Sequence, residues 1–196
     1  MELNNKRKIL FRNDDVNPNS DFKAIRKMYD TILQYFPNAE IYSCVNLFSQ
    51  ETSEGNVYPP TKKLAKDRDY FLVNKMFDFK SLKYLERIVS HGMWHLDHKH
   101  CNNELQKYSI VSSCRILKTN LFVPPFWRYN QDTRDICSEY GIKLWVDTTW
   151  INFDNLDIIP EKRYYLFHSW KFTPESFAKK MKENIKTLKK NENTKI

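Results

Sequence analysis

The chain has 196 residues, of which 41% are hydrophobic and 15% aromatic, and its formal net charge is +8. This length corresponds to about one domain, and this composition excludes a disordered chain. No apolar run approaches the roughly 18 residues of a transmembrane helix, so we expect no membrane association and one domain over residues 1–196.

The positive charge lies at the two ends. Residues 1–12 carry a net +3 and residues 171–196 a net +5, so the stretch between them is neutral. A nucleic-acid-binding protein is expected to gather basic and aromatic residues on its working surface. We therefore interpret the lysines as solubilising and expect no nucleic-acid partner, while a weak contact with an anionic partner stays open.

The N-terminal residues include basic side chains but no apolar segment after them, so no secretory signal is recognised. We expect a cytoplasmic protein, and the lysine and asparagine content is typical of an AT-rich viral or bacterial genome. The four cysteines fit no zinc-binding C-x2-C spacing. We expect them to be reduced and buried.

Short β-rich runs alternate with helical segments along the chain. The predicted strands are residues 7–12, 40–48, a third that Ile88-Val89 leads into and that ends at the histidine cluster, 121–125, 142–148 and 163–170. The predicted helices are 21–36 with Ser20 as N-cap, 102–118, 131–140 ending at Gly141, and a last one starting at Thr173-Pro174-Glu175. Residues 49–75 are predicted to be a long loop or insertion, and residues from about 190 to 196 a frayed tail.

This alternation predicts an α/β fold with a mostly parallel sheet and outer helices. In such a fold the carboxyl ends of the strands open on one side, where active sites form. Polar or special residues end five of the predicted strands. They are Asn13, Asp14 and Asp15; His91 and His95; Pro124, Pro125 and Phe126; Asp147; and His168.

The stretch SHGMWHLDHKH (90–100) holds four of the five histidines. His91 and His95 are four residues apart, close enough in one tight loop to face one ion, and two imidazoles with a carboxylate from Asp15 or Asp14 form a typical catalytic zinc set. The alternative is a pair of rings hydrogen-bonded within a loop. His98 and His100 are interpreted as outer or solvent-exposed residues, and Asp97 as a carboxylate that orients a metal-bound ring.

Five segments, in order, resemble the motifs of the polysaccharide deacetylase superfamily (NodB homology, carbohydrate esterase family 4). They are RNDDV (12–16), SHGMWH (90–95), FVPPFW (122–127), LWVDTTW (144–150) and LFHSW (166–170). The resemblance implies a distorted (β/α) barrel of the NodB type. It also implies that Asp14 is the general base, that Asp15, His91 and His95 bind the metal, and that His168 is the catalytic acid.

The resemblance implies three further roles. The backbone N–H of Phe126 would be the oxyanion donor, Asp147 would be the acidic residue of the fourth motif, and Leu166 would line the pocket for the acetyl methyl group. The chain departs from the family at several positions. Val123 stands where an arginine usually pairs with the base, and Arg128 is a candidate to replace it. Phe126 replaces the family's usual tyrosine, Trp127 and Val16 replace glycines, and Asn13 replaces a phenylalanine.

The implied reaction is hydrolysis of an N-acetyl or O-acetyl group on a sugar or polysaccharide, with Zn²⁺ or another divalent transition metal as cofactor. The aromatic residues near the strand ends are candidates for stacking on sugar rings, and only two or three of them are expected to be exposed. The candidate substrate-binding residues are Trp94, Trp127, Arg128, Leu166 and Trp170. Three alternatives stay open: a hydrolase of a non-sugar amide or another acyl group, a sugar-binding domain without turnover, and a basic nucleic-acid- or anion-binding protein.

Overall fold

The computed structural model describes residues 9–49, 75–146, 149–159 and 162–193. Its main sheet has seven strands in the order β7-β6-β5-β2-β1-β9-β8, and every neighbouring pair is parallel. The strands are β1 (Leu10–Val16), β2 (Glu40–Val45), β5 (Arg87–Ser90), β6 (Leu121–Phe122), β7 (Lys143–Leu144), β8 (Ile151–Asn152) and β9 (Tyr164–Phe167). A separate antiparallel pair joins β3 (Phe48–Ser49) to β4 (Lys75–Met76).

The main sheet is curled into a half-barrel, with β7 and β8 as its two edges. This arrangement confirms the predicted distorted (β/α) barrel with parallel strands. Because all seven strands are parallel, their carboxyl ends lie along one rim. The central strand β1 therefore brings Asp14 and Asp15 to the same rim as the residues that follow β5, β6 and β9.

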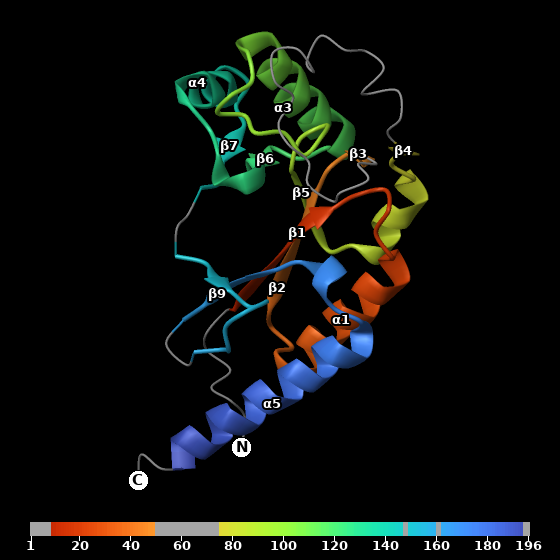
Figure 1. Ribbon diagram of the computed structural model, residues 1–196, viewed down its shortest axis with the longest axis vertical. Coiled ribbons are helices and arrows are strands. Elements are labelled where there is room, and N and C mark those ends of the chain that lie inside the picture. Colours follow the sequence, from red (N-terminus) through yellow and green to blue (C-terminus); the bar gives the residue numbers. More distant parts are fainter. Residues whose placement is uncertain (1–8, 50–74, 147–148, 160–161, 194–196) are drawn as a thin grey trace.

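Within the described residues, four α-helices cover the sheet: α1 (Phe22–Tyr35), α3 (Asn103–Leu117), α4 (Gln131–Glu139) and α5 (Pro174–Asn193). In Figure 1, α1 and α5 lie side by side against one part of the sheet, and α3 and α4 lie together at the β6 and β7 end. The part of the chain that the structure describes also has three short 3-10 helices, η2 (Phe79–Tyr84), η3 (Pro125–Trp127) and η4 (Ser169–Lys171). The last two directly follow β6 and β9, at the rim.

The helices agree with the predicted ones because their end signals are local in sequence. The α1 N-cap is Asp21, whose carboxylate accepts a hydrogen bond from the Ala24 N–H, so the predicted cap at Ser20 is one residue too early. Gly141 has the expected left-handed backbone after α4. The apolar face of α5 is buried, with Phe177 and Met181 fully covered.

The strands differ more from their predicted bounds. β1 continues through Asp15 to Val16, so the acidic pair lies inside the strand and not after it. The predicted strands at 121–125 and 142–148 shrink to two residues each, and β8 has no predicted counterpart. Such short strands carry too few residues for a period-two pattern. Residues 50–74 of the predicted loop, Asp147, and the end of the predicted tail (194–196) lie outside the described residues.

The main core fills the space between the sheet and the helices α1 and α5, with Phe11, Tyr165 and Phe177 among its largest members. The four cysteines are free thiols in buried positions, as predicted. Burial raises the pKa of Cys101 and Cys137 to about 12 and that of Cys114 to about 11, so none of these three is a reactive thiolate at neutral pH. Among the described helices, none has the length and apolarity to cross a bilayer.

Candidate metal centre

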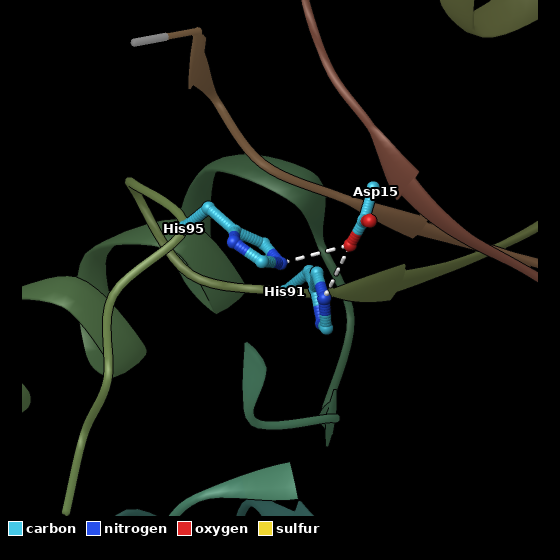
Figure 2. Close-up of side chains that lie close together, drawn as sticks. All are labelled: Asp15, His91 and His95. Carbon is cyan, nitrogen blue, oxygen red and sulfur yellow. Dashed lines mark ion pairs between the residues drawn. The ribbon is translucent and has the colours of Figure 1, made fainter. Parts of the chain in front are cut away.

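Asp15, His91 and His95 converge at the rim of the sheet, as Figure 2 shows. Asp15 Oδ1 lies 2.8 Å from His95 Nε2 and 3.3 Å from His91 Nε2. One oxygen and two imidazole nitrogens, all within 4.8 Å of one another, are a donor set suited to a divalent transition metal. Asp15 comes from β1, and the two histidines come from the loop that follows β5. In the sheet, β2 lies between these two strands.

The His91 ring is held in the tautomer that metal binding requires. Its Nδ1–H donates a 2.7 Å hydrogen bond to the carbonyl of Val123, which leaves Nε2 free as a ligand atom. The ring is almost fully buried. The backbone of Val123 therefore orients His91, although its side chain cannot act as the arginine that usually stands in the third motif.

Asp15 owes its position to a break in strand β1. The backbone of Asp15 is left-handed (φ 62°), and the register with β2 shifts between Asn13 and Val16. A bulge of this kind re-aims a side chain that would otherwise follow the alternation of the strand. Burial alone would raise the pKa of Asp15, but hydrogen bonds from His91 and His95 hold it well below its ordinary value. The carboxylate is thus ionised and available to a cation.

The second oxygen of Asp15 faces different groups. Asp15 Oδ2 accepts a long hydrogen bond of 3.4 Å from the indole N–H of Trp170 and lies 3.6 Å from His168 Nε2. The segment holding these two residues is fixed to β1, because the Ser169 N–H donates to Asn13 Oδ1 at 2.9 Å. Asn13, which stands where the family has phenylalanine, therefore ties the β9 end to the metal-binding strand.

His168 is paired with Asp154, a residue that follows β8. Asp154 Oδ2 accepts from His168 Nδ1 at 2.5 Å, and Oδ1 accepts from the His168 N–H at 2.9 Å. Lys171 Nζ lies 3.0 Å from the same Oδ2. Burial lowers the pKa of His168, but the hydrogen bond to Asp154 together with the negative charges of Asp15, Asp154 and Asp14 outweighs it, and the net shift is upward. His168 therefore keeps its proton to a higher pH than an ordinary imidazole.

Asp14 is paired with Arg12, two residues earlier on the same strand. Arg12 Nε and Nη2 each lie 2.7 Å from one oxygen of Asp14, in a buried bidentate ion pair. The Arg12 guanidinium carbon lies 4.7 Å from the ring centroid of Trp127 and 4.5 Å from that of Trp150. Two tryptophan rings and a carboxylate thus hold the guanidinium, and its Nη1 is buried without a partner.

Helix η3 carries an unusual backbone. Phe126 and Trp127 are both left-handed, with φ of 55° and 59°. The Phe126 ring lies 4.4 Å, centroid to centroid, from that of His95, and no hydrogen bond of the described residues uses the Phe126 N–H as donor. The predicted oxyanion donor is therefore beside a candidate metal ligand and has its N–H available.

The remaining predicted substrate-binding residues lie in varied places. Trp94 is 8% exposed and packs between Phe48 and Tyr108, and Leu166 is buried on β9 next to Arg12. Trp127 lies on Arg12, and Arg128 is exposed. Trp170 is the most exposed large hydrophobic residue among those described. Asp147 lies outside the described residues.

Two expectations about polar residues are wrong, and one of the two alternatives for His98 is excluded. Arg128 does not pair with Asp14: its Nη1 lies 2.8 Å from Asp97 Oδ2. Asp97 orients no metal-binding ring, because its carboxylate contacts Arg128 and His100. His98 is not solvent-exposed but fully buried, and burial lowers its pKa to about 3, so the ring is neutral. Its Nδ1–H donates to the Leu96 carbonyl, and its Nε2 has no partner.

Two functional candidates were not predicted from the sequence. Arg12 carried a usable signal, because residues i and i+2 of a strand lie on one face and an arginine two before a buried aspartate is placed to pair with it. Asp154 carried none, because the strand before it has only two residues and the loop has no motif. It becomes visible only through its contact with His168.

Solved structures with the same fold belong to carbohydrate esterase family 4. The family 4 carbohydrate esterase from Streptomyces lividans, in complex with acetate, has a TM-score of 0.55 at 9% identity, over 93% of this chain and 89% of that one. The peptidoglycan deacetylase PdaC from Bacillus subtilis has a TM-score of 0.53 at 11% identity, over 93% and 85%. A family 4 pseudoenzyme from Bacillus anthracis has a TM-score of 0.52 at 12% identity, over 92% and 62%.

No protein-family model matches the sequence, and no curated protein matches it. The likeness is therefore one of structure at about 10% identity, which establishes the fold alone. The chain has the NodB-type fold of the polysaccharide deacetylases, as the five ordered motifs indicated. Both active enzymes and a pseudoenzyme share that fold, so activity has to be argued from the residues at the rim.

Proposed function

We propose that the chain is a divalent metal-dependent hydrolase that removes N-acetyl (or O-acetyl) groups from a sugar or polysaccharide. The single observation that carries the proposal is the convergence of Asp15, His91 and His95 on one point of the rim. Beside them, Asp14 is held in an ion pair and His168 is paired with the carboxylate of Asp154. A ligand set, a base and an acid are the parts that such hydrolysis requires.

The donor set fits zinc. Two imidazoles whose Nε2 atoms face one ionised carboxylate match the three protein ligands of catalytic zinc sites, which keep further positions open. When bound, Zn²⁺ or another divalent transition metal would polarise the acyl carbonyl and lower the pKa of a water molecule to about 7. The left-handed backbone of Asp15 supports this assignment, because such strain is typically retained at functional sites.

Different residues of the chain would then accept and donate the protons of the reaction. Asp14 accepts the proton of the attacking water, and its ion pair with Arg12 fixes its orientation. His168 donates a proton to the departing sugar amine, and its raised pKa, to which Asp154 contributes, favours the protonated ring. The Phe126 N–H donates to the oxygen that becomes negative in the transition state. The role of Asp147 stays a prediction from the fourth motif.

A sugar substrate is supported by what the structural neighbours act on. One neighbour is a carbohydrate esterase in complex with acetate and another is a peptidoglycan deacetylase. Exposed aromatic side chains at the rim, above all Trp170, are suited to the apolar faces of sugar rings. A carbohydrate partner therefore agrees with both the fold and the surface of this site.

A second candidate is a carbohydrate-binding domain without turnover. It is favoured by Val123 in place of the usual arginine and by the Bacillus anthracis pseudoenzyme among the neighbours. The Arg12–Asp14 pair weakens this candidate, because the base has a guanidinium partner from another position. A same-fold hydrolase of a non-sugar amide is the third candidate, and it would share the metal site.

The test is acetate release from chitooligosaccharides and peptidoglycan fragments by the zinc-loaded protein. We expect turnover that falls about 100-fold or more in His91→Ala and in Asp14→Asn. His100→Ala is the matched control, because this exposed histidine of the same loop contacts Asp97 and not the metal centre. Absence of acetate release from every glycan, with zinc bound, would contradict the proposed activity.

A further inference from the structure

Two segments that follow neighbouring strands supply different parts of the candidate site. The histidine loop (residues 91–101, after β5) carries the candidate metal-binding histidines, and the η3 segment (residues 123–130, after β6) carries the Phe126 N–H. Strands β5 and β6 are paired at a single position, Ser90 with Phe122. So short a ladder constrains the two segments only where they leave the sheet. Contacts between the segments therefore determine where the N–H lies relative to the histidines.

An ion pair joins these two segments beyond the sheet. Arg128 Nη1 lies 2.8 Å from Asp97 Oδ2, and the Asp97 carboxylate is fully buried, so it requires a partner. His100 donates to the same oxygen at 2.9 Å, but it belongs to the histidine loop itself and does not connect the segments. A longer hydrogen bond of 3.3 Å runs from Asn130 Nδ2 to the Lys99 carbonyl. Among the described residues, Arg128–Asp97 is the one ion pair between the two segments.

The Phe126 N–H lies between two connections to the histidine loop. Before it in the chain, the Val123 carbonyl accepts a hydrogen bond of 2.7 Å from His91 Nδ1. After it comes the Arg128–Asp97 pair. The first connection holds the start of the η3 segment, and only the second holds the part that follows the N–H.

The backbone between these connections is strained. Phe126 and Trp127 are both left-handed, with φ of 55° and 59°. Bulky residues keep such a backbone only where the surrounding structure over-determines it. Arg128 is the next residue, and its side chain is anchored in the histidine loop. Without that anchor the two residues are free to relax to an ordinary backbone, which would turn the Phe126 N–H away from its place beside His95.

We propose that Arg128 and Asp97 are positioning residues, whose ion pair holds the Phe126 N–H in place beside the metal centre. Neither residue is one of the three candidate metal ligands, so the pair acts through the backbone of the η3 segment. The use of that N–H in turnover rests on the proposed function, whereas the fixing of the segment does not. Arg128 thus has a task different from binding the sugar.

The first test compares acetate release by zinc-loaded Arg128→Met with that by the wild type. Loss of an oxyanion donor costs about 100-fold or more, so a donor that is displaced but still present should cost about 10-fold. The loss should fall on kcat and leave KM nearly unchanged, because the N–H is needed in the transition state. Arg128→Lys keeps the charge without the planar fork and should recover part of the loss.

The second test requires no turnover. Acetate, the product of the proposed reaction, offers a carboxylate oxygen to the Phe126 N–H. In ¹⁵N-labelled, zinc-loaded protein, the chemical shift of the Phe126 amide during an acetate titration reports the surroundings of this N–H and the affinity for acetate. We expect Arg128→Met to weaken acetate binding about 3- to 10-fold, the range of one hydrogen bond, and to keep the zinc affinity of the wild type.

Two further variants separate positioning from folding. Arg128→Met leaves the Asp97 carboxylate buried without its arginine, which destabilises the fold. Arg128→Met/Asp97→Asn also removes that charge, so it should be the more stable protein and still show the same losses in kcat and acetate affinity. Arg134→Met is the matched control, because this exposed arginine of α4 donates to Tyr129 and not to the histidine loop. It should behave as the wild type does, and circular dichroism establishes that each variant is folded.

Two results would overturn the proposal. One is wild-type kcat and acetate affinity in both Arg128→Met and the double variant. The other is a zinc affinity that falls together with kcat, because the pair would then support the metal ligands and not the N–H.

The two tests also distinguish failure of the positioning role from failure of the proposed function. If acetate affinity falls in Arg128→Met and recovers in Arg128→Lys while the wild type releases no acetate from any glycan, the positioning role stands and the hydrolase activity fails. If wild type and Arg128→Met release acetate equally well, the activity stands and the positioning role fails. A zinc-loaded wild type that neither binds acetate nor releases it would refute both.

Discussion

The Arg12–Asp14 pair is the feature of single residues that most affects the functional interpretation. The usual arginine of the third motif is Val123 here, which on sequence grounds alone leaves the base without a partner. Arg12 pairs with both carboxylate oxygens from within β1 and is itself enclosed by tryptophan rings. The candidate base Asp14 is therefore oriented by a partner on its own strand.

This pair predicts a specific pattern of stability. Arg12→Met removes the guanidinium and leaves the carboxylate of Asp14 buried and unpaired, so we expect the free energy of unfolding to fall by about 3–5 kcal/mol. The double variant Arg12→Met/Asp14→Leu replaces both partners by apolar groups and should be destabilised by about 1 kcal/mol or less. Denaturant unfolding of the three proteins measures both values, and equal losses in single and double variants would refute the pairing.

The pairing of His168 with Asp154 predicts the basic limb of the pH–rate profile. Because the pKa of His168 is raised, the acid form persists as the pH passes about 6.5, the ordinary imidazole value, and is lost only above it. Asp154→Asn removes the carboxylate that raises this pKa, so the basic limb of kcat/KM should move to lower pH. Asp157→Asn, in the same loop, is the control. A basic limb that stays in place in Asp154→Asn would exclude His168 as the acid.

Secondary-structure elements with local signals could be predicted from the sequence, and the others could not. The helices were found because a cap, an apolar stripe and a glycine stop lie within a few residues of one another, as at Gly141. The strands β6, β7 and β8 have two residues each, so their pairing depends on neighbours distant in the chain. The strand-end positions of the candidate metal ligands were nevertheless predictable, because parallel topology alone brings them to one rim.

The loop after β5 illustrates a contact that only the structure reveals. Gly92 lies between the two candidate metal-binding histidines and has φ of +95°. A Cβ at Gly92 would lie 2.9 Å from both Ser109 Oγ and the Trp94 carbonyl oxygen. The sequence shows a glycine in a histidine-rich loop, but helix α3, which carries Ser109, is what leaves no room for a side chain.

Gly92→Ala should therefore destabilise the protein and displace the histidines. Backbone strain together with overpacking predicts a loss of about 2–4 kcal/mol in the free energy of unfolding and weaker zinc binding. Gly141→Ala is the matched control, because Gly141 also has positive φ (+63°) but no atom within 4 Å of an added Cβ. It should lose about 1 kcal/mol and keep its zinc affinity. Unfolding curves and zinc titrations of both variants test this difference.

At the scale of the whole molecule, the order of the motifs predicted the barrel correctly. It did so although the chain is only about 10% identical in sequence to the solved structures that share its fold. The reason is physical: the motif residues occupy the ends of parallel strands, so their order along the chain fixes the strands that must converge. What the order could not supply was the partner of each motif residue. Arg12, Asp154 and the Val123 carbonyl reach the site through folding, from positions that the motifs do not mark.

Convergence of β1 with the loop after β5 also links metal binding to the stability of the whole domain. An ion that binds only the folded chain stabilises it by mass action, about 2.7 kcal/mol at 100 times its dissociation constant. For a domain of this size that corresponds to a rise in Tm of about 5–10 °C. We expect zinc to produce this rise, a chelator to reverse it, and His91→Ala and His95→Ala to abolish it.

His100→Ala, in the same histidine-rich loop, should keep the full rise because His100 is bound to Asp97 instead. A zinc-induced rise that survives in His91→Ala would place the ion elsewhere, and the proposed hydrolysis would then lose its cofactor site.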